Sequence, residues 1–590
     1  MTTEVVESLH EQLRIALEGI TLVNGPRLAG TLLWAGLGIL AFWYIALREN
    51  DQPIHYTIPP PKKPEIVEIL EEPAIKISGS TAIQCYAPAT GQFLGIVNPS
   101  TPDTIDRAVE QAQAAQTKWA TTSFRERRAV LRSLLQHVLD NQEEICRVAC
   151  LDSGKTMVDA QFGEVLVTTA KLEWTIKHGE KALRPSRRPT NLLMMYKRNT
   201  VYYEPLGVVA ALVSWNYPFH NLIGPVISAL FSGNAIVVKV SERTAWSSVY
   251  FTNIIRGALV AHGHSPALVQ TVVCWPQAAG HITSHPGISH ITFIGSRPVV
   301  AELGGKDASI VLDSLSKREL PRVIEILMRG SFQASGQNCI GIERIITTPA
   351  LYDRLVSLLE PRVRALRLGP TADVGAMISD ASFSRLEELI DDAVRHGARL
   401  LVGGKRFVHP DHPQGHYFAP TLLVDVTPDM TIANEECFAP IMVLMRAPSG
   451  SAEDILAVAN APDFGLGSSV FGSESDPRIK KIVKGIKAGM IAVNDFGATY
   501  AVQMPFGGVS GSGYGRFAGE EGLRGLCNVK AVCEDRMAWL GIRTAIPKPM
   551  QYPIPDQERS WRFARGVVEV GYGMGIWRKL GSVLGIIKNS

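Results

Sequence analysis

The stretch VVAALVSWNYPF, residues 208–219, joins a short apolar run to a polar end. Residues 208–213 carry no charge and are too few for a helix of ordinary length, so they predict a buried strand. Asn216 follows this run, at the expected carboxyl end of the strand. Open α/β sheets bind ligands outside the carboxyl ends of their strands, which makes Asn216 a candidate site residue. A structural asparagine in a turn is the alternative.

Apolar runs and helical patterns alternate along the rest of the chain. Residues 104–119 and 124–140 have the periodicity of amphipathic helices, and residues 235–240 form a second run typical of a buried strand. Such alternation predicts an α/β fold class with a parallel sheet. Further strands are expected at residues 291–294, 308–312, 342–347 and 489–493.

Composition narrows the class of protein. The chain has 590 residues, 46% of them hydrophobic and 19% charged, so it is long enough for two or more domains with large cores. Its 59 basic and 56 acidic side chains nearly cancel, which argues against a nucleic-acid partner. The eight cysteines are scattered and form no CxxC pair, so a reducing compartment is expected rather than a disulfide framework.

One segment has the character of a membrane span. Leu28 to Leu47 is 20 residues without a charge, bracketed by Arg27 and Arg48, and is long enough to cross a bilayer as one transmembrane helix. A slight excess of basic residues after it favours a cytosolic position for the rest of the chain. We expect a single-pass protein of the endoplasmic reticulum with its folded body in the cytosol; a buried core helix is the alternative.

Two proline-rich stretches flank the folded body. The first, residues 48–76, predicts a stiff extended linker that holds the body off the membrane, and the body is expected to start near Ile77. The second leads into a glycine-rich C-terminal tail, residues 546–590. This tail is expected to be solvated or docked on the body, with contact to a membrane surface as the alternative.

Three short motifs do not carry a ligand site. Gly154-Lys155-Thr156 resembles the end of a phosphate-binding loop, but Ala149 stands where that loop requires a glycine. The glycine cluster 511–515 lacks the GxGxxG spacing and a preceding buried strand, so it is read as a turn. A histidine group also lies in a proline-containing loop, and no metal centre is expected there. Its members are His409, His412 and His416.

Two further segments place a reactive side chain among small neighbours. Cys339 ends the stretch FQASGQNC, where a tight turn or helix start can favour the thiolate. Glu302 precedes Gly304 and Gly305 in AELGGK, residues 301–306. Taken separately, a buried inert cysteine and a surface acid in a turn are the ordinary readings of these residues.

Taken together, these segments resemble the aldehyde dehydrogenase superfamily. The likeness covers roughly residues 80–530. Within the family, the N-terminal apolar segment and the stretch GQNCIGIER at 336–344 most resemble the fungal membrane-anchored, meiotic sister chromatid recombination type. The other motifs lie in the family's order: KVSE at 239–242, FIGS at 293–296, EECFAP at 435–440 and PFGG at 505–508.

The resemblance implies a covalent redox reaction. Cys339 is the expected nucleophile, which attacks an aldehyde carbonyl, and the Asn216 amide with the Cys339 backbone N–H is expected to hold the oxyanion. Glu302 is expected to activate the water that hydrolyses the resulting thioester to a carboxylic acid. Retention of these residues argues against the runner-up, a catalytically impaired membrane scaffold or binding protein.

The same resemblance implies NAD as cofactor. Lys239 and Glu242 match the contacts to the adenosine ribose, and a carboxylate there disfavours the 2′-phosphate of NADP. Glu436 and Phe438 match the residues around the nicotinamide ribose. The remaining expected cofactor-binding residues are Trp215, Ser241, Gly295 and Ser296.

The expected architecture has three parts and a homodimeric or homotetrameric assembly. They are a Rossmann-like NAD-binding domain, an α/β catalytic domain and a small bridging β-element used for oligomerisation. The expected boundaries are 77–301 for the NAD-binding domain with part of the bridging element, 302–500 for the catalytic domain, and 501–545 for the return segment and the rest of the bridging element.

The chain departs from the family between Ser296 and Glu302. Only five residues separate them, whereas the family usually has a helix and a connection there, so about 16 residues are missing relative to the family. Parallel strands ordinarily need a crossover of about a dozen residues or more. The missing helix is also the one expected to face the cofactor phosphates. An exon lost in gene prediction, a splice variant and a true deletion all remain open.

Overall fold

The computed structural model describes residues 52–62, 67–190, 195–294, 301–496, 503–554, 556–572 and 576–590. The transmembrane helix predicted at residues 28–47 lies outside this part of the chain. Within the described ranges, no helix combines the length and apolarity that crossing a bilayer requires.

The first of two large sheets has five parallel strands in the order β7-β6-β5-β8-β9. Their bounds are β5 Val208–Leu212, β6 Ala235–Val240, β7 Val269–Val273, β8 His290–Ile294 and β9 Ala301–Glu302. From β5 the chain builds outward through β6 and β7 in one direction, and then through β8 and β9 in the other. The switch point therefore lies between β5 and β8, where the crevice for a ligand is expected.

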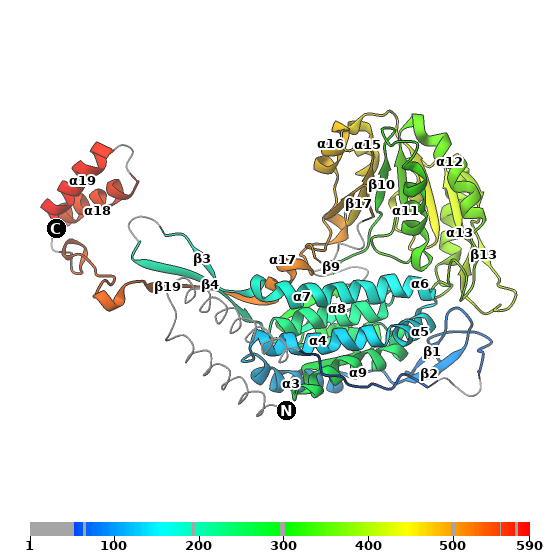
Figure 1. Cartoon of the computed structure of the whole chain (residues 1–590), viewed down its shortest axis with the longest axis horizontal. Coiled ribbons are helices and arrows are strands. Elements are labelled where there is room, and N and C mark those ends of the chain that lie inside the picture. The colour runs from blue at the N-terminus through cyan, green and yellow to red at the C-terminus, as the bar shows by residue number, and fades with distance from the viewer. Residues whose placement is uncertain are drawn as a thin grey trace, which may run out of the picture.

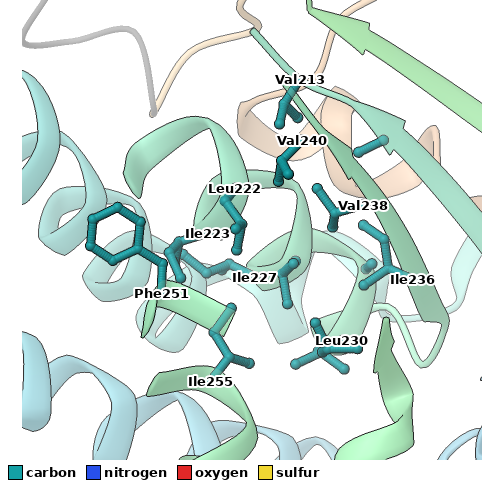
Figure 2. Close-up of a cluster of buried hydrophobic side chains, with 14 of the residues drawn as sticks. Val213, Leu222, Ile223, Ile227, Leu230, Ile236, Val238, Val240, Phe251 and Ile255 are labelled. Carbon is teal, nitrogen blue, oxygen red and sulfur yellow. The ribbon is translucent and has the colours of Figure 1, made fainter. Parts of the chain in front are cut away.

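Helices surround this sheet and share one core with it (Figure 1). Their bounds are α3 Pro102–Trp119, α4 Phe124–Asp140, α5 Gln142–Ser153, α6 Met157–Ala160, the π-helical turn η2 Gln161–Leu166, α7 Val167–Leu183, α8 Pro218–Phe231, α9 Ala245–Ala261 and α10 Pro276–Thr283. Figure 2 shows Leu222, Ile223 and Ile227 of α8 beside Val238 and Val240 of β6. Almost every side chain of α8 and β5 is buried. This packing holds both elements in place and so sets the position of the carboxyl end of β5.

The second large sheet has seven strands in the order β12-β15-β16-β11-β10-β17-β18, and only the edge strand β12 runs antiparallel. Their bounds are β10 Ala308–Val311, β11 Arg344–Thr347, β12 Arg399–Val402, β15 Thr421–Val424, β16 Ile441–Arg446, β17 Gly467–Phe471 and β18 Met490–Val493. The helices packed on it are α11 Leu320–Phe332, α12 Pro349–Arg364, α13 Phe383–Arg395, α15 Ala452–Ala459 and α16 Pro477–Gly485.

A three-stranded antiparallel sheet, β19-β4-β3, extends away from these two sheets (Figure 1). Its bounds are β3 Ser186–Arg188, β4 Lys197–Pro205 and β19 Cys527–Asp535. The short helix α17, Gly519–Arg524, precedes β19. β3 and β4 come from the expected NAD-binding region and β19 from the expected return segment, and the bridging role of this sheet stays a prediction.

The expected helices and strands are present among the described residues, and two of these elements match their expected bounds residue for residue. α4 spans residues 124–140 and β6 spans residues 235–240. β9 includes Glu302 and pairs with β8, so the first large sheet extends one residue past the expected boundary at 301.

The proline-rich linker differs from the expectation of a free spacer. Tyr56 stacks on His137 with ring centroids 4.5 Å apart, and its hydroxyl donates to the carbonyl oxygen of Ile254. The Ile54 N–H donates to Ser133 Oγ at 2.7 Å. An aromatic side chain with a satisfied hydroxyl gains more by packing than by remaining solvated, so this part of the linker lies on the body.

The C-terminal tail contains secondary structure that was not predicted. It contains two helices, α18 Gln557–Tyr572 and α19 Ile576–Asn589, which pack on each other. Gly566 of α18 lies against Ile586 and Ser582 of α19, so this glycine permits the close approach of the two helices. Figure 1 shows the pair beyond the three-stranded sheet, apart from the two α/β sheets.

Candidate active site

Asn216 lies just after β5, and its side chain is fixed by hydrogen bonds. Its Oδ1 accepts from Ser214 Oγ at 2.6 Å and from Asn221 Nδ2 at 3.1 Å. Its Nδ2 donates to the carbonyl oxygen of Gln337 at 3.2 Å. Gln337 is two residues before Cys339, so the two predicted catalytic segments meet although they are far apart in the sequence.

A strained turn presents Cys339. Ala334, Ser335 and Gly336 all have left-handed φ values, of 53°, 57° and 70°. The Ala334 N–H donates to Asp159 Oδ2 at 2.9 Å, and Ser335 Oγ donates to the carbonyl oxygen of Gly375 at 2.7 Å. A Cβ on Gly336 would lie 2.0 Å from the carbonyl oxygen of Ala439. The turn is therefore held from several sides, as a preorganised nucleophile requires.

Cys339 is partly exposed and lines a cavity of about 590 Å³. Six apolar side chains form much of the wall around it: Val158, Phe162, Leu166, Phe496, Phe506 and Phe517. Tyr217 lies on the same wall, and burial raises the pKa of its phenol well above its usual range, with the charge of a Cys339 thiolate adding to this. The Tyr217 hydroxyl therefore stays protonated beside the sulfur.

A buried polar network lies behind Asn216, and the sequence did not reveal it. Lys155 Nζ contacts Glu164 Oε1 at 2.5 Å and donates to the carbonyl oxygen of Asn216 at 2.7 Å. Glu164 Oε2 in turn accepts from the backbone N–H of His220 at 2.8 Å. In the sequence, Lys155 belongs only to a motif that resembles the end of a phosphate-binding loop. The structure instead gives this lysine a positioning role, which a local motif cannot indicate.

Lys171 is a second buried amine that the sequence did not single out. It lies on α7, lines the same cavity and is 5% exposed. Burial lowers its pKa to about 8, and it also lowers the pKa of the neighbouring His220 to about 3, with help from the charges of Lys171 and Lys155. His220 is therefore neutral, and Lys171 titrates close to physiological pH.

The predicted cofactor residues form two groups at the crevice. At the carboxyl end of β6, Lys239 Nζ and Glu242 Oε2 are 3.0 Å apart, and both side chains are mostly buried. Ser241 between them is buried, and its Oγ accepts from the Arg243 N–H at 3.3 Å. A carboxylate and an amine at this position fit the hydroxyls of a ribose.

The second group joins the two large sheets. The rings of Trp215 and Phe438 meet edge to face, 5.6 Å apart. Glu436 Oε1 accepts from the Gly305 N–H at 2.9 Å, so the carboxylate lies against the turn that follows β9. Trp215, Glu436 and Phe438 are thus brought to the same crevice as the β5 end.

The structure describes only the backbone of the predicted base Glu302, and it describes neither Gly295 nor Ser296. Glu302 is at the end of β9, where Ile294 pairs with it across the sheet, but its side chain is outside the description. Gly295 and Ser296 also lie outside the described residues, as does the rest of the connection through residue 300. The backbone thus places Glu302 at the crevice, and its role stays a prediction.

Potential metal ligands lie elsewhere. His416 contacts the Tyr86 hydroxyl, and it does not form a group with His409 and His412. In the part of the chain that the structure describes, Asp106, His281 and His285 are the one group close enough to share an ion. However, His285 Nδ1 accepts from the Gly287 N–H, so Nε2 carries the proton of the neutral ring. The expectation of no metal centre stays a prediction.

Comparison with known proteins adds an independent line of evidence. The model of the aldehyde dehydrogenase family matches residues 75–532. An aldehyde dehydrogenase-like protein of Schizosaccharomyces pombe, C21C3, is 50% identical over 513 residues, covering 84% of this chain and 97% of its own length. Another from Saccharomyces cerevisiae, YHR039C, is 50% identical over 539 residues, covering 86% and 83%.

A solved structure agrees in fold. The crystal structure of a Mycobacterium tuberculosis aldehyde dehydrogenase complexed with NAD⁺ matches with a TM-score of 0.70 and 28% identity, covering 78% of this chain and 95% of the other.

Proposed function

The chain belongs to the aldehyde dehydrogenase family, and from this premise we propose that it oxidises an apolar aldehyde to a carboxylic acid with NAD. The observation that carries the proposal is the hydrogen bond from Asn216 Nδ2 to the carbonyl of Gln337, which joins the end of β5 to the Cys339 turn. This contact brings the Asn216 amide and the Cys339 turn to one place, where both can act on one substrate.

In the proposed reaction, Cys339 Sγ attacks the aldehyde carbonyl carbon and forms a thiohemiacetal. The Asn216 amide and the Cys339 backbone N–H stabilise the oxyanion, and the loss of one such donor typically costs about 3 to 4 kcal/mol of transition-state stabilisation. NAD, when bound, supplies the acceptor for the hydride that leaves the thiohemiacetal carbon. The product on Cys339 is a thioester, and Glu302 removes a proton from the water that hydrolyses it.

The residues at the crevice are suited to NAD. Lys239 and Glu242 would hold the adenosine ribose, and Trp215, Glu436 and Phe438 would lie on the nicotinamide side. Glu242 favours NAD over NADP because its carboxylate accepts from a ribose hydroxyl but repels a phosphate. Titration of both cofactors against the purified protein tests this preference, and tighter binding of NADP would contradict it.

The cavity supports an apolar aldehyde as substrate. Phe162, Phe496, Phe506 and Phe517 line the cavity beside Cys339, and this apolar wall suits an apolar chain. Lys171, Arg329 and Asp495 line the same cavity. A volume of about 590 Å³ accommodates more than a two-carbon aldehyde. We expect kcat/KM to rise with the length of an aliphatic aldehyde.

Two features of location and assembly belong to the same proposal. Residues 28–47 would form a single membrane span, in the endoplasmic reticulum with the body in the cytosol, close to lipid-derived aldehydes. The sheet β19-β4-β3 would pair with another copy in a homodimer or homotetramer. Protease protection in membrane vesicles and the mass of the detergent-solubilised protein test these two points.

A second candidate is a catalytically impaired membrane scaffold or binding protein that keeps the fold. One observation favours it, namely the six-residue connection between β8 and β9, which is shorter than a parallel crossover ordinarily needs. In that case the protein would fold but would not bind NAD.

The two candidates are separated by NADH formation at 340 nm with a series of aldehydes. The chain from Gln52 onward is compared with its Cys339→Ala variant, and NAD binding is measured on both. Activity that disappears in the variant supports the dehydrogenase. A folded protein with no activity and no NAD binding would sink the enzyme proposal and favour the scaffold.

A further inference from the structure

The C-terminal helix pair exposes large apolar side chains that nothing in the described structure covers. On α19, Ile576, Leu580, Leu584 and Ile587 are 69%, 49%, 69% and 65% exposed. Their spacing of four, four and three residues places them on one face of the helix. Trp577 of the same helix is 83% exposed. The surface of a soluble protein rarely carries such a continuous apolar face without a partner.

The segment that leads to the pair has the same character. Trp539, Ile546 and Tyr552 are 81%, 59% and 89% exposed, and Trp561 of α18 is 68% exposed. Tryptophan and tyrosine prefer the boundary between water and hydrocarbon, because one part of the ring is apolar and the other can hydrogen-bond. We call residues 536–590, which include this segment, α18 and α19, the C-terminal unit.

The net charge of the C-terminal unit indicates what kind of partner binds its apolar surface. The C-terminal unit has nine basic and three acidic residues, a net charge of +6, whereas the rest of the chain has 50 basic and 53 acidic residues, a net charge of −3. All of the positive excess of the chain thus lies in the unit where the apolar side chains are exposed. Lys579 and Lys588 flank the apolar face of α19, and this helix has no acidic residue.

We propose that the C-terminal unit binds the surface of an anionic membrane, with the exposed apolar face of α19 inserted among the lipid headgroups. A helix with apolar and aromatic residues on one side and basic residues beside them lies in the plane of such an interface. A two-fold contact with a second copy fits less well, because it would bring two units of charge +6 together. The proposal does not depend on aldehyde oxidation or on the predicted span at residues 28–47.

The test uses the full chain reconstituted in vesicles, with a photoreactive benzoylphenylalanine at Leu584. Val408 in the second α/β domain is the matched control, because it is similarly exposed, at 63% against 69% for Leu584. Vesicles of phosphatidylcholine are compared with vesicles that also contain phosphatidylserine. After illumination, adducts to lipid, to a second copy and within the chain are separated by mass.

We expect several-fold more lipid adduct from position 584 than from position 408, and more in the anionic vesicles. Lys579→Glu with Lys588→Glu should reduce the adduct several-fold in anionic vesicles and leave the zwitterionic value nearly unchanged. If this variant does not fold, probing Ile587 in the otherwise natural chain replaces it. Adducts mainly to a second copy or to residues 1–51, or a lipid yield at 584 no higher than at 408, would overturn the proposal.

Discussion

The segments that carry the predicted nucleophile and the predicted base are supported very differently. The Cys339 turn is tied to Asp159, Gly375 and Asn216 by hydrogen bonds from three other parts of the chain. β9, which carries Glu302, pairs with β8 through two residues and follows it by a connection of six. The proposed chemistry at sulfur therefore rests on a preorganised scaffold, whereas the proposed water-activating step rests on one short strand.

The largest expected effect is on the nucleophile side. Cys339→Ala should lower the rate of NADH formation by roughly 10⁴-fold or more, because no covalent adduct can form. Steady-state assays measure this, and Cys533→Ala is the control, since Cys533 is exposed on the three-stranded sheet. Comparable activity in the two variants would mean that another residue is the nucleophile.

Loss of Lys155 from the buried polar network behind Asn216 should lower the stability of the protein strongly. Lys155→Met leaves Glu164 buried without its partner, so the free energy of unfolding should fall by about 3 to 5 kcal/mol. Denaturant titration measures the loss. Lys155→Met combined with Glu164→Leu removes both charges and should recover much of the stability. If the double variant is no more stable than the single one, the ion pair is not the cause.

The proposed oxyanion role of Asn216 predicts a smaller effect on the rate. Asn216→Ala should lower kcat by about 10²- to 10³-fold, since it removes one hydrogen-bond donor. NAD affinity should stay nearly constant, because the residues expected to bind the cofactor are others. A variant that loses NAD affinity in proportion to its activity would show that Asn216 supports the crevice rather than the oxyanion.

Lys171→Met should stabilise the protein by up to about 3 kcal/mol at pH 7. The folded pKa of about 8 lies below the usual value for an unfolded lysine, so the buried ammonium costs stability throughout the range below pH 8. As pH rises above 8 the folded lysine loses its proton, and the cost disappears near pH 10.5. Melting temperatures of both proteins from pH 6 to 10 test this. A gap that widens with pH would contradict the lowered pKa.

Local patterns in the sequence were enough to predict much of the fold. α4 and β6 were predicted to the residue because a clear apolar period, or an uninterrupted apolar run, depends only on neighbouring residues. The meeting of Asn216 with the Cys339 turn followed only from the family resemblance, since no local rule joins segments 120 residues apart.

Other features depended on contacts that no local pattern encodes. Lys155 approaches Asn216 only after α5, α6 and β5 have assembled, so its motif alone was uninformative. The helix pair of the C-terminal tail was not predicted, because glycines disfavour a helix, although the residues at 576, 580, 584 and 587 have helical spacing. Tyr56 packs on the body through a single aromatic side chain that the surrounding prolines obscured.

The central claim is that Cys339 forms a thioester and that Glu302 is needed to hydrolyse it despite the short connection before β9. The direct measurement is peptide mass after the Glu302→Gln variant has been mixed with NAD and an aliphatic aldehyde. The account predicts a burst of about one NADH per site and an acyl group on the peptide that contains Cys339. A folded variant that binds NAD but leaves Cys339 unmodified would contradict it.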